Sequence, residues 1–212
     1  MSFDALAPHY RWMEFVLAGE KLQRCRTAFL DQIKSPRNVL LLGEGPGRFL
    51  VECGRRWPNA EITCVDSSRR MLAVARAQLR RAGFSNERVT FLHADVLGWR
   101  PPDDLADLIV THFFLDCFVP EQLERIVARL AGAARPGASW LLADFQVPAA
   151  GLLRWRARLM LAAMYAFFRR TTQLPADRLT APDDFLRRHG LTLRQHCEAE
   201  WGLLRSDHWI KD

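Results

Sequence analysis

The sequence predicts an α/β protein with a doubly wound, Rossmann-like and mostly parallel sheet. Short apolar runs alternate along the chain with amphipathic segments of helical length. A glycine-rich turn follows the first run, and acidic residues follow the next two. Strands that are separated by helices in this way form βαβ units with right-handed crossovers, so we expect neighbouring core strands to be parallel.

Five short segments are expected to form the core of the sheet. They are Asn38–Leu42, Glu61–Val65, Arg88–His93, Asp107–Phe114 and Ser139–Phe145. The fourth segment is apolar enough to be buried on both faces, as strands in a parallel sheet usually are. The run Arg135-Pro136-Gly137 is expected to be a turn that leads into the fifth strand.

Three helices are predicted between these strands, and their ends carry the usual signals. A serine cap, a glycine stop and a proline in the first turn mark such ends. The helices are expected from about Gly47 to Arg56, from a cap at Ser67 or Ser68 to about Ala82, and from Pro120 to about Ala134.

The rest of the chain is expected to extend this core within a single domain, residues 1–212. Residues 1–35 are predicted to be a helical cap, 36–146 the core, 147–190 a helical lid, and 191–212 a C-terminal hairpin. The lid contains a long helix from Gly151 to Arg170 and a short one near Pro182–His189. The hairpin strands, Leu191–Glu198 and Leu203–Ile210, would add an antiparallel strand at the sheet edge.

Composition limits the cellular setting. Five cysteines without a C-x-x-C pair argue against a disulfide framework or a zinc ribbon, and no metal site is expected. They indicate a reducing compartment, and the N-terminus lacks the pattern of a signal peptide. The longest apolar stretch, Leu159–Phe168, is too short to span a bilayer. We therefore expect a cytoplasmic protein.

The net charge of +6 has two interpretations. The simpler one is a solvated basic surface, because the arginines are spread along the chain. The other is an acidic partner such as nucleic acid, an anionic lipid surface or an anionic substrate.

The run LLLGEGPGRFL, from Leu40 to Leu50, places three glycines at the exit of the first predicted strand. Glycine there removes the Cβ that would hold a ligand away and permits φ > 0 in the turn. In an open α/β sheet, ligands bind beyond the carboxyl ends of the strands. We therefore predict a small-molecule cradle at Gly43, Gly45 and Gly47.

The glycine spacing alone does not identify the ligand. A dinucleotide fingerprint requires G-x-G-x-x-G/A, but position 48 is Arg, and the G-K-[ST] of a P-loop is absent. Asp66 ends the second strand, where a carboxylate can accept two hydrogen bonds from a ribose diol. Asp95 follows the third strand and could accept from an adenine amino group. These acids indicate a nucleoside.

Together these elements resemble the class I S-adenosylmethionine-dependent methyltransferases, in particular the small-molecule, ubiquinone/menaquinone-methyltransferase-like type. The matching motifs are LLLGEGPGRFL, CVDSSRRML, HADV, DLIVTHFFLD and RPGASWLLADF, and the opening FDALAPHYRWME is similar as well. The resemblance covers roughly residues 39–145. It implies S-adenosyl-L-methionine as the cofactor and a small-molecule acceptor.

The resemblance also implies roles for individual residues. Gly43, Gly45 and Gly47 would lie along the methionine part of the cofactor, and Asp66 would bind the ribose. Met71 and Ser67 would pack near the adenine, with Asp95 and the backbone of Val96 at its amino edge. The backbone around Thr111 and His112 would face the sulfonium, and Tyr10 would close over the site. Family members often carry an acid two residues before the first glycine. Leu41 stands there instead, so Glu44 or backbone carbonyls would meet the ammonium group.

Two side chains after the fourth strand are candidates for a general base, His112 and Asp116. Each could instead be structural: His112 as a buried, hydrogen-bonded residue and Asp116 as a cap. The predicted helix Leu152–Arg170 could pack on the sheet face, cover an apolar or anionic acceptor, contact another subunit or lie on a membrane surface.

Two other functions remain alternatives. The basic charge suggests a nucleic-acid methyltransferase, but no N-P-P-Y or D-P-P-Y run and no RNA-binding module are present. The glycine loop is also compatible with a non-catalytic nucleotide-binding protein, although Arg48 argues against nicotinamide cofactors.

Overall fold

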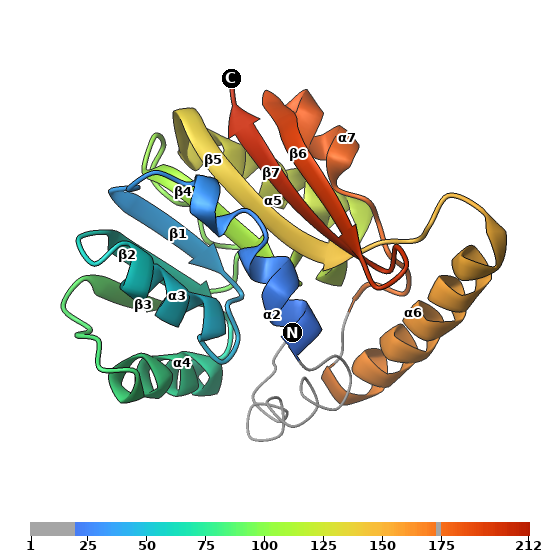
Figure 1. The fold of residues 1–212 in the computed structure, drawn as a ribbon, viewed down its shortest axis with the longest axis horizontal. Coiled ribbons are helices and arrows are strands. Elements are labelled where there is room, and N and C mark those ends of the chain that lie inside the picture. The colour runs from blue at the N-terminus through green and yellow to red at the C-terminus, as the bar shows by residue number, and fades with distance from the viewer. Residues whose placement is uncertain (1–19, 173–174) are drawn as a thin grey trace.

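The computed structural model describes residues 20–172 and 175–212, and it confirms the doubly wound α/β fold. Figure 1 shows one twisted sheet with helices on both faces. The strands are β1 (Asn38–Leu42), β2 (Glu61–Asp66), β3 (Val89–His93), β4 (Ala106–His112), β5 (Ala134–Phe145), β6 (Leu191–Ala199) and β7 (Leu204–Lys211). They lie in the order β3-β2-β1-β4-β5-β7-β6.

The direction of the strands follows from their connections. The first five are parallel, because each is joined to the next by a crossover. The C-terminal hairpin then pairs with β5 through β7, which runs antiparallel and lies between β5 and β6. The predicted hairpin therefore joins the sheet, with β6 in the outermost position.

Helices cover both faces. They are α2 (Glu20–Thr27), η1 (Leu30–Gln32), α3 (Arg48–Arg56), α4 (Arg69–Arg81), η2 (Leu115–Cys117), α5 (Pro120–Ala133), α6 (Gly151–Thr172) and α7 (Asp183–Arg188). Gly47 is the N-cap of α3, with φ +85°, and Ser68 caps α4 by accepting from the backbone N–H of Met71 at 3.1 Å. Both caps lie at or next to their predicted positions.

Two apolar cores lie on opposite faces of the sheet, because successive strand residues point to opposite sides. On one face Leu40 and Leu42 of β1 belong to the core formed with α5 and α7. On the other face Val39 and Leu41 belong to the core formed with α3 and α4. The first strand is thus buried on both sides.

Two predicted boundaries were wrong. The fourth strand ends at His112 rather than Phe114, because Phe113 adopts φ +53°, which ends the extended conformation. The expected turn at Arg135-Pro136-Gly137 is instead part of β5, where the pairing register with β4 shifts and Gly137 has φ +77°. The chain bends at this irregularity and continues in the sheet.

The long helix α6 does not pack on a sheet face. Its buried side chains Ala157, Leu161 and Tyr165 contact a small apolar cluster with Ala176 and Leu203. Figure 1 shows α6 at one end of the molecule, beyond the hairpin turn. Of the helices in the described ranges, none combines the length and the apolar character that crossing a bilayer requires.

Candidate active site

A cavity of about 840 Å³ lies at the carboxyl ends of the parallel strands. One half is formed by the ends of β1, β2 and β3, and the other half by α6, the loop after β4 and the β6–β7 turn. The lining residues of the first half are Leu42, Gly43, Gly45, Val65, Asp66, Ser67, Met71, Ala94, Asp95, Val96 and Leu97. This is the edge where a doubly wound sheet binds ligands.

The glycine loop forms the floor of this first half. Gly43 and Gly45 line the cavity with φ of +62° and +64°, and the N–H of Gly43 donates to the carbonyl of Val65 at 2.9 Å. A Cβ on Gly43 would lie 2.3 Å from Cδ2 of Phe114. Gly43 is therefore required both by its backbone conformation and by the ring that closes over it.

Two residues of the loop lie elsewhere than predicted. Glu44 does not line the cavity: its Oε1 accepts from the N–H groups of Phe49 at 2.7 Å and Leu50 at 3.1 Å. It thereby caps α3, where a carboxylate complements the positive end of the helix, and is not placed to meet an ammonium group. Gly47 packs against α4 instead, since a Cβ there would lie 2.8 Å from Cα of Ala75.

The predicted nucleoside residues meet in the cavity. Asp66 lies at the end of β2, and its Oδ1 accepts from the N–H of Ser68 at 2.8 Å. The side chain of Met71 is buried beside it in the first turn of α4. Ser67 lines the wall between them, so three residues that are close in sequence share one side of the site.

Asp95 and Val96 form the opposite wall after β3. The Oδ1 of Asp95 accepts from the N–H of Leu97 at 3.0 Å, which orders the turn, and Val96 is buried. The carboxylate of Asp95 is exposed to the cavity mouth. Arg129 of α5 also stabilises this loop by donating a hydrogen bond to the carbonyl of Leu97 at 2.5 Å.

Thr111 and His112 are not among the residues that line the cavity, and the role expected for their backbone at the sulfonium stays a prediction. Thr111 Oγ1 accepts from Nε1 of Trp140 at 2.8 Å on one side of β4. His112 points to the other side, where its ring packs edge-on against Phe49 with centroids 4.6 Å apart. Strand alternation thus directs both side chains into the layers beside the sheet.

His112 also lacks the electrostatics of a general base. Burial first, and then the positive charge of Arg26, hold the pKa of its imidazole well below the usual value of 6.5. Its Nδ1 has no hydrogen-bond partner among the described residues. His112 is therefore a neutral residue of the layer next to α3, and its role as a base stays a prediction. The prediction that Tyr10 closes over the site falls on a residue outside the described ranges.

Asp116, the other predicted base, does line the cavity. It lies in η2 after β4, and Tyr165 of α6 donates to its carbonyl at 3.0 Å. Burial raises the pKa of its carboxyl group from 3.8 to about 6. Asp116 is thus ionised at neutral pH, with a pKa closer to the working pH than that of an exposed carboxylate.

A second buried acid, Asp144, supports Asp116. It lies near the end of β5, where its two oxygens accept from the N–H groups of Asp116 at 3.2 Å and Phe145 at 2.8 Å. Burial first, and then the charge of Asp116, raise the pKa of Asp144 well above 3.8. Sequence reasoning missed Asp144, although an acid at the tip of the fifth predicted strand was a readable signal.

The second half of the cavity is mostly apolar. Its walls are aromatic, aliphatic and methionine side chains, including Phe113, Phe114, Phe118, Phe145, Met160, Leu161, Met164, Tyr165, Phe167, Phe168, Trp201, Leu203 and Leu204. Besides Asp116, three charged residues also reach it. Lys21 pairs with Glu200, and the guanidinium of Arg156 stacks on the ring of Trp201 at 4.6 Å. The sequence offered two signals for this half: the aromatic residues Phe113, Phe114 and Phe118 after the fourth predicted strand as a possible apolar pocket, and the predicted helix Leu152–Arg170 as a possible cover.

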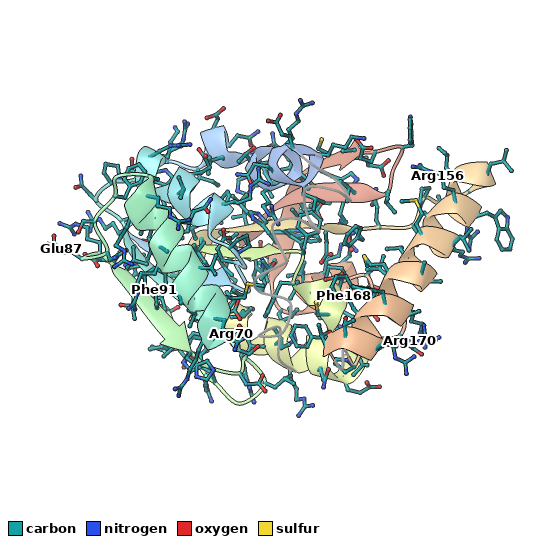
Figure 2. The ribbon with its side chains drawn as sticks, turned by 90° about the horizontal axis from the view of Figure 1, so that it is seen from below. Arg70, Glu87, Phe91, Arg156, Phe168 and Arg170 are labelled. Atoms are coloured by element: carbon teal, nitrogen blue, oxygen red, sulfur yellow. The ribbon has the colours of Figure 1, made fainter. Side chains whose placement is uncertain are left out.

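Figure 2 shows how the two halves are assembled. Phe168 projects from α6 towards the sheet, while Arg70 lies on α4 across the gap between the two helices. A doubly wound sheet with a glycine loop and two strand-tip carboxylates in one cavity defines a nucleoside-binding α/β protein of the class that binds at the first crossover.

Comparisons with known proteins identify the family. The model of a family described as "Methyltransferase domain" matches residues 39–137. A trans-aconitate 2-methyltransferase from Mycobacterium sp. (strain KMS) is 38% identical over 114 residues, which cover 54% of this chain and 39% of that protein. A demethylmenaquinone methyltransferase from Thermus thermophilus is 30% identical over 151 residues, which cover 70% of this chain and 66% of that protein.

A solved structure agrees with the sequence comparisons. The N-methyltransferase NodS from Bradyrhizobium japonicum WM9, in complex with S-adenosyl-L-homocysteine, superimposes with a TM-score of 0.63 at 16% identity. The alignment covers 98% of this chain and 89% of NodS. The chain belongs to the class I S-adenosylmethionine-dependent methyltransferases. It spans less than half the length of the trans-aconitate methyltransferase that it matches.

Proposed function

We propose that this protein transfers a methyl group from S-adenosylmethionine to a small, largely apolar acceptor held under α6. One observation carries the proposal: a single cavity joins the glycine loop and strand-tip acids to an apolar chamber with one buried carboxylate, Asp116. Of the proposed regions, residues 36–146 would hold the cofactor, residues 147–190 would enclose the acceptor, and residues 1–35 would form a cap.

The first half of the cavity fits the cofactor. Gly43 and Gly45 leave bare backbone for its methionine part, and Asp66 offers a carboxylate to its ribose hydroxyls. Met71 and Ser67 would pack against the adenine, with Asp95 and the backbone of Val96 at its amino edge. When bound, S-adenosylmethionine supplies an electrophilic sulfonium methyl group.

The protein's own residues then have three tasks. Phe113, Phe114 and the α6 side chains exclude water from the chamber. The same walls align the acceptor, and alignment alone is worth about 7–11 kcal/mol of barrier. The carboxylate of Asp116 takes the proton from the acceptor's hydroxyl or amino group, which contributes about 10²–10⁴-fold in rate.

The character of the second half supports an apolar acceptor. Aromatic and methionine side chains dominate its walls, and its charged residues are already engaged: Lys21 with Glu200, and Arg156 with Trp201. An aromatic hydroxyl compound such as a hydroquinone matches such a surface and presents a proton for Asp116. An anionic acceptor of the kind named for the trans-aconitate relatives would have to displace these pairings.

The alternative functions fit less well. A nucleic-acid acceptor needs an open basic groove, whereas this chamber is lined mostly by apolar side chains. A non-catalytic nucleotide-binding protein would not need an apolar chamber with a buried, ionised acid beside the nucleoside site. The predicted cytoplasmic location is compatible with five free cysteines, which a reducing compartment maintains.

Calorimetry tests the cofactor site. S-Adenosylhomocysteine should bind the wild type, whereas NAD should not. Asp66→Ala should lower the affinity at least tenfold, because the ribose loses a charge-assisted bidentate partner. The matched control is Glu87→Ala, an exposed acid at the far end of the molecule (Figure 2). Unchanged affinity in Asp66→Ala, or binding of NAD instead, would refute the site.

A second assay tests the acceptor class. Release of S-adenosylhomocysteine is measured with a hydroquinone bearing a short apolar chain and, separately, with trans-aconitate. Turnover with the hydroquinone alone is the expected result. Turnover with trans-aconitate alone would overturn the apolar assignment while leaving the methyltransferase activity in place.

A further inference from the structure

Helix α6 has a second face that the active site does not use. Its buried side chains Ala157, Leu161, Tyr165 and Thr172 follow one another in steps of four, four and seven residues, so they lie on one side of the helix. That side covers the cavity. The other side faces away from the rest of the protein, and its composition is unusual for a surface that meets only water.

An apolar stripe runs along this outer side. Leu152, Trp155 and Leu159 are 87%, 68% and 74% exposed, and the exposed Ala162 and Ala166 continue the series. Steps of three and four residues place all five on one face of a helix. Large apolar side chains gathered on an exposed surface commonly mark an interaction site.

The charges around the stripe are of one sign. Helix α6 carries Arg154, Arg156, Arg158, Arg169 and Arg170 and no acidic residue. Within the described ranges, none of these arginines forms an ion pair with a carboxylate. The guanidinium of Arg158 instead lies 5.7 Å from the ring of Trp155, beside the stripe. Figure 2 shows Arg156 and Arg170 towards opposite ends of the helix.

We propose that the outer face of α6 docks this protein on an anionic lipid surface. The stripe would enter the boundary between headgroups and acyl chains, and the exposed arginines Arg158, Arg169 and Arg170 would reach the lipid phosphates. A helix with an apolar face, tryptophan and unpaired arginines is suited to this position. Each basic residue near an anionic lipid surface increases the partitioning of the protein onto that surface about fivefold.

Two other partners match the surface less well. A second copy of the chain, packed symmetrically through this face, would bring five arginines against five with no acid between them. A nucleic acid would neutralise the arginines but would leave Leu152, Trp155 and Leu159 without an apolar partner. An anionic lipid surface, unlike these two, offers apolar chains and negative charge together at the depth of one helix.

Docking would also have a consequence for the acceptor, and this part rests on the proposed function. The inner face of α6 lines the apolar chamber, so the helix would separate the chamber from the bilayer by its own width. An acceptor dissolved in the bilayer would then reach the chamber without crossing bulk water. The docking test below uses no cofactor and no acceptor, so its outcome is independent of the methyltransferase assignment.

Vesicle flotation tests the docking with the full chain. One set of vesicles is phosphatidylcholine alone, and the other contains about one third phosphatidylglycerol. The wild type should float with the anionic vesicles at least tenfold more than with the neutral ones, and raised salt should weaken this binding. With brominated lipids, tryptophan fluorescence should be quenched, and Trp155→Phe should remove most of that quenching.

Matched variants separate the stripe and the arginines from general charge. Leu159→Glu should lower binding at least tenfold, and Arg158→Gln with Arg169→Gln should lower it about 25-fold, as the product of two fivefold effects. Arg80→Gln with Arg81→Gln removes the same charge from α4, on the opposite side of the molecule (Figure 1), and should change binding less than threefold.

Circular dichroism and melting temperature verify that each variant is folded, as expected at exposed positions. The proposal is overturned if the wild type stays unbound with anionic vesicles, or if the α6 and α4 arginine pairs have equal effects. It is also overturned if sedimentation shows a dimer that Leu159→Glu abolishes while vesicles are not bound, because the stripe would then be a protein interface.

Discussion

Replacing Asp116 by asparagine should slow catalysis and stabilise the fold at the same time. The carboxyl group is buried at the cavity wall, and its pKa rises from 3.8 to about 6 on folding. This rise corresponds to about 3 kcal/mol of folding free energy, which the wild type loses when the group ionises. Asparagine keeps the shape of the side chain and never carries the charge.

The sign of the effect depends on pH. Because the folded pKa is raised, the native state retains its proton between about pH 4 and pH 6 while the unfolded chain loses it. The stability of the wild type therefore falls across this window and stays low above it. Asp116→Asn should match the wild type below about pH 4 and exceed it by up to about 3 kcal/mol at pH 8. That difference raises the melting temperature by about 6–12 °C.

The catalytic effect has the opposite sign. With an apolar hydroxyl acceptor, kcat of the wild type should rise through about pH 6 and then level off, as Asp116 becomes ionised. Asp116→Asn should lower kcat by about 10²–10⁴-fold and abolish that rise, while the affinity for S-adenosylhomocysteine stays unchanged.

Two assays check the reasoning, with Glu87→Gln as an exposed control that should alter neither result. Denaturant unfolding between pH 4 and pH 8 gives the stability difference, and release of S-adenosylhomocysteine gives kcat. Equal stability of wild type and variant at pH 8 would show that Asp116 is not a buried, ionised group. Undiminished kcat would show that it is not the base.

Two further predictions concern Gly43 in the glycine loop and His112 at the end of β4. Gly43→Ala should lower the free energy of unfolding by at least about 2 kcal/mol, since φ is +62° and the new Cβ would lie 2.3 Å from the ring of Phe114. Adding Phe114→Ala should relieve the clash but not the backbone strain, and denaturant unfolding measures both effects. Unchanged stability of Gly43→Ala would contradict the geometry. His112→Leu should keep kcat within about threefold, and a larger loss would return His112 to the site. The lowered pKa of His112 makes the wild type lose stability as the pH falls below 6.5, so the leucine variant should also melt less readily than the wild type under acid conditions.

Local sequence signals were sufficient for the architecture and for half of the site. The apolar runs around Leu40 and Ile109 and the helix caps are short-range features, so the order of strands and helices follows from them. Gly43, Asp66 and Asp95 lie directly after predicted strands. Because parallel strands end at one edge of the sheet, their convergence in one cavity could be expected without coordinates.

Only the tertiary structure decided which way the remaining side chains point. His112 is the last residue of β4 and Asp116 lies just beyond that strand, yet alternation buries His112 against Phe49, and the turn at Phe113 brings Asp116 into the cavity. A shift of one residue along a strand moves a side chain to the opposite face of the sheet. The amino-acid composition at a strand end does not determine where the strand stops, so it does not predict which face such a side chain occupies. The tertiary structure also decided the role of Glu44, which caps α3 because the backbone N–H groups of Phe49 and Leu50 lie within reach of its carboxylate.

The position of α6 was the other feature that the tertiary structure decided. Its apolar residues surround the helix, so periodicity indicates a helix but does not say which face is buried. The face with Leu161 and Tyr165 is buried because it contacts the β6–β7 turn and Asp116, both of which are far from α6 in sequence. The sequence thus determined the frame of this protein through short-range signals, whereas the apolar chamber depends on long-range packing.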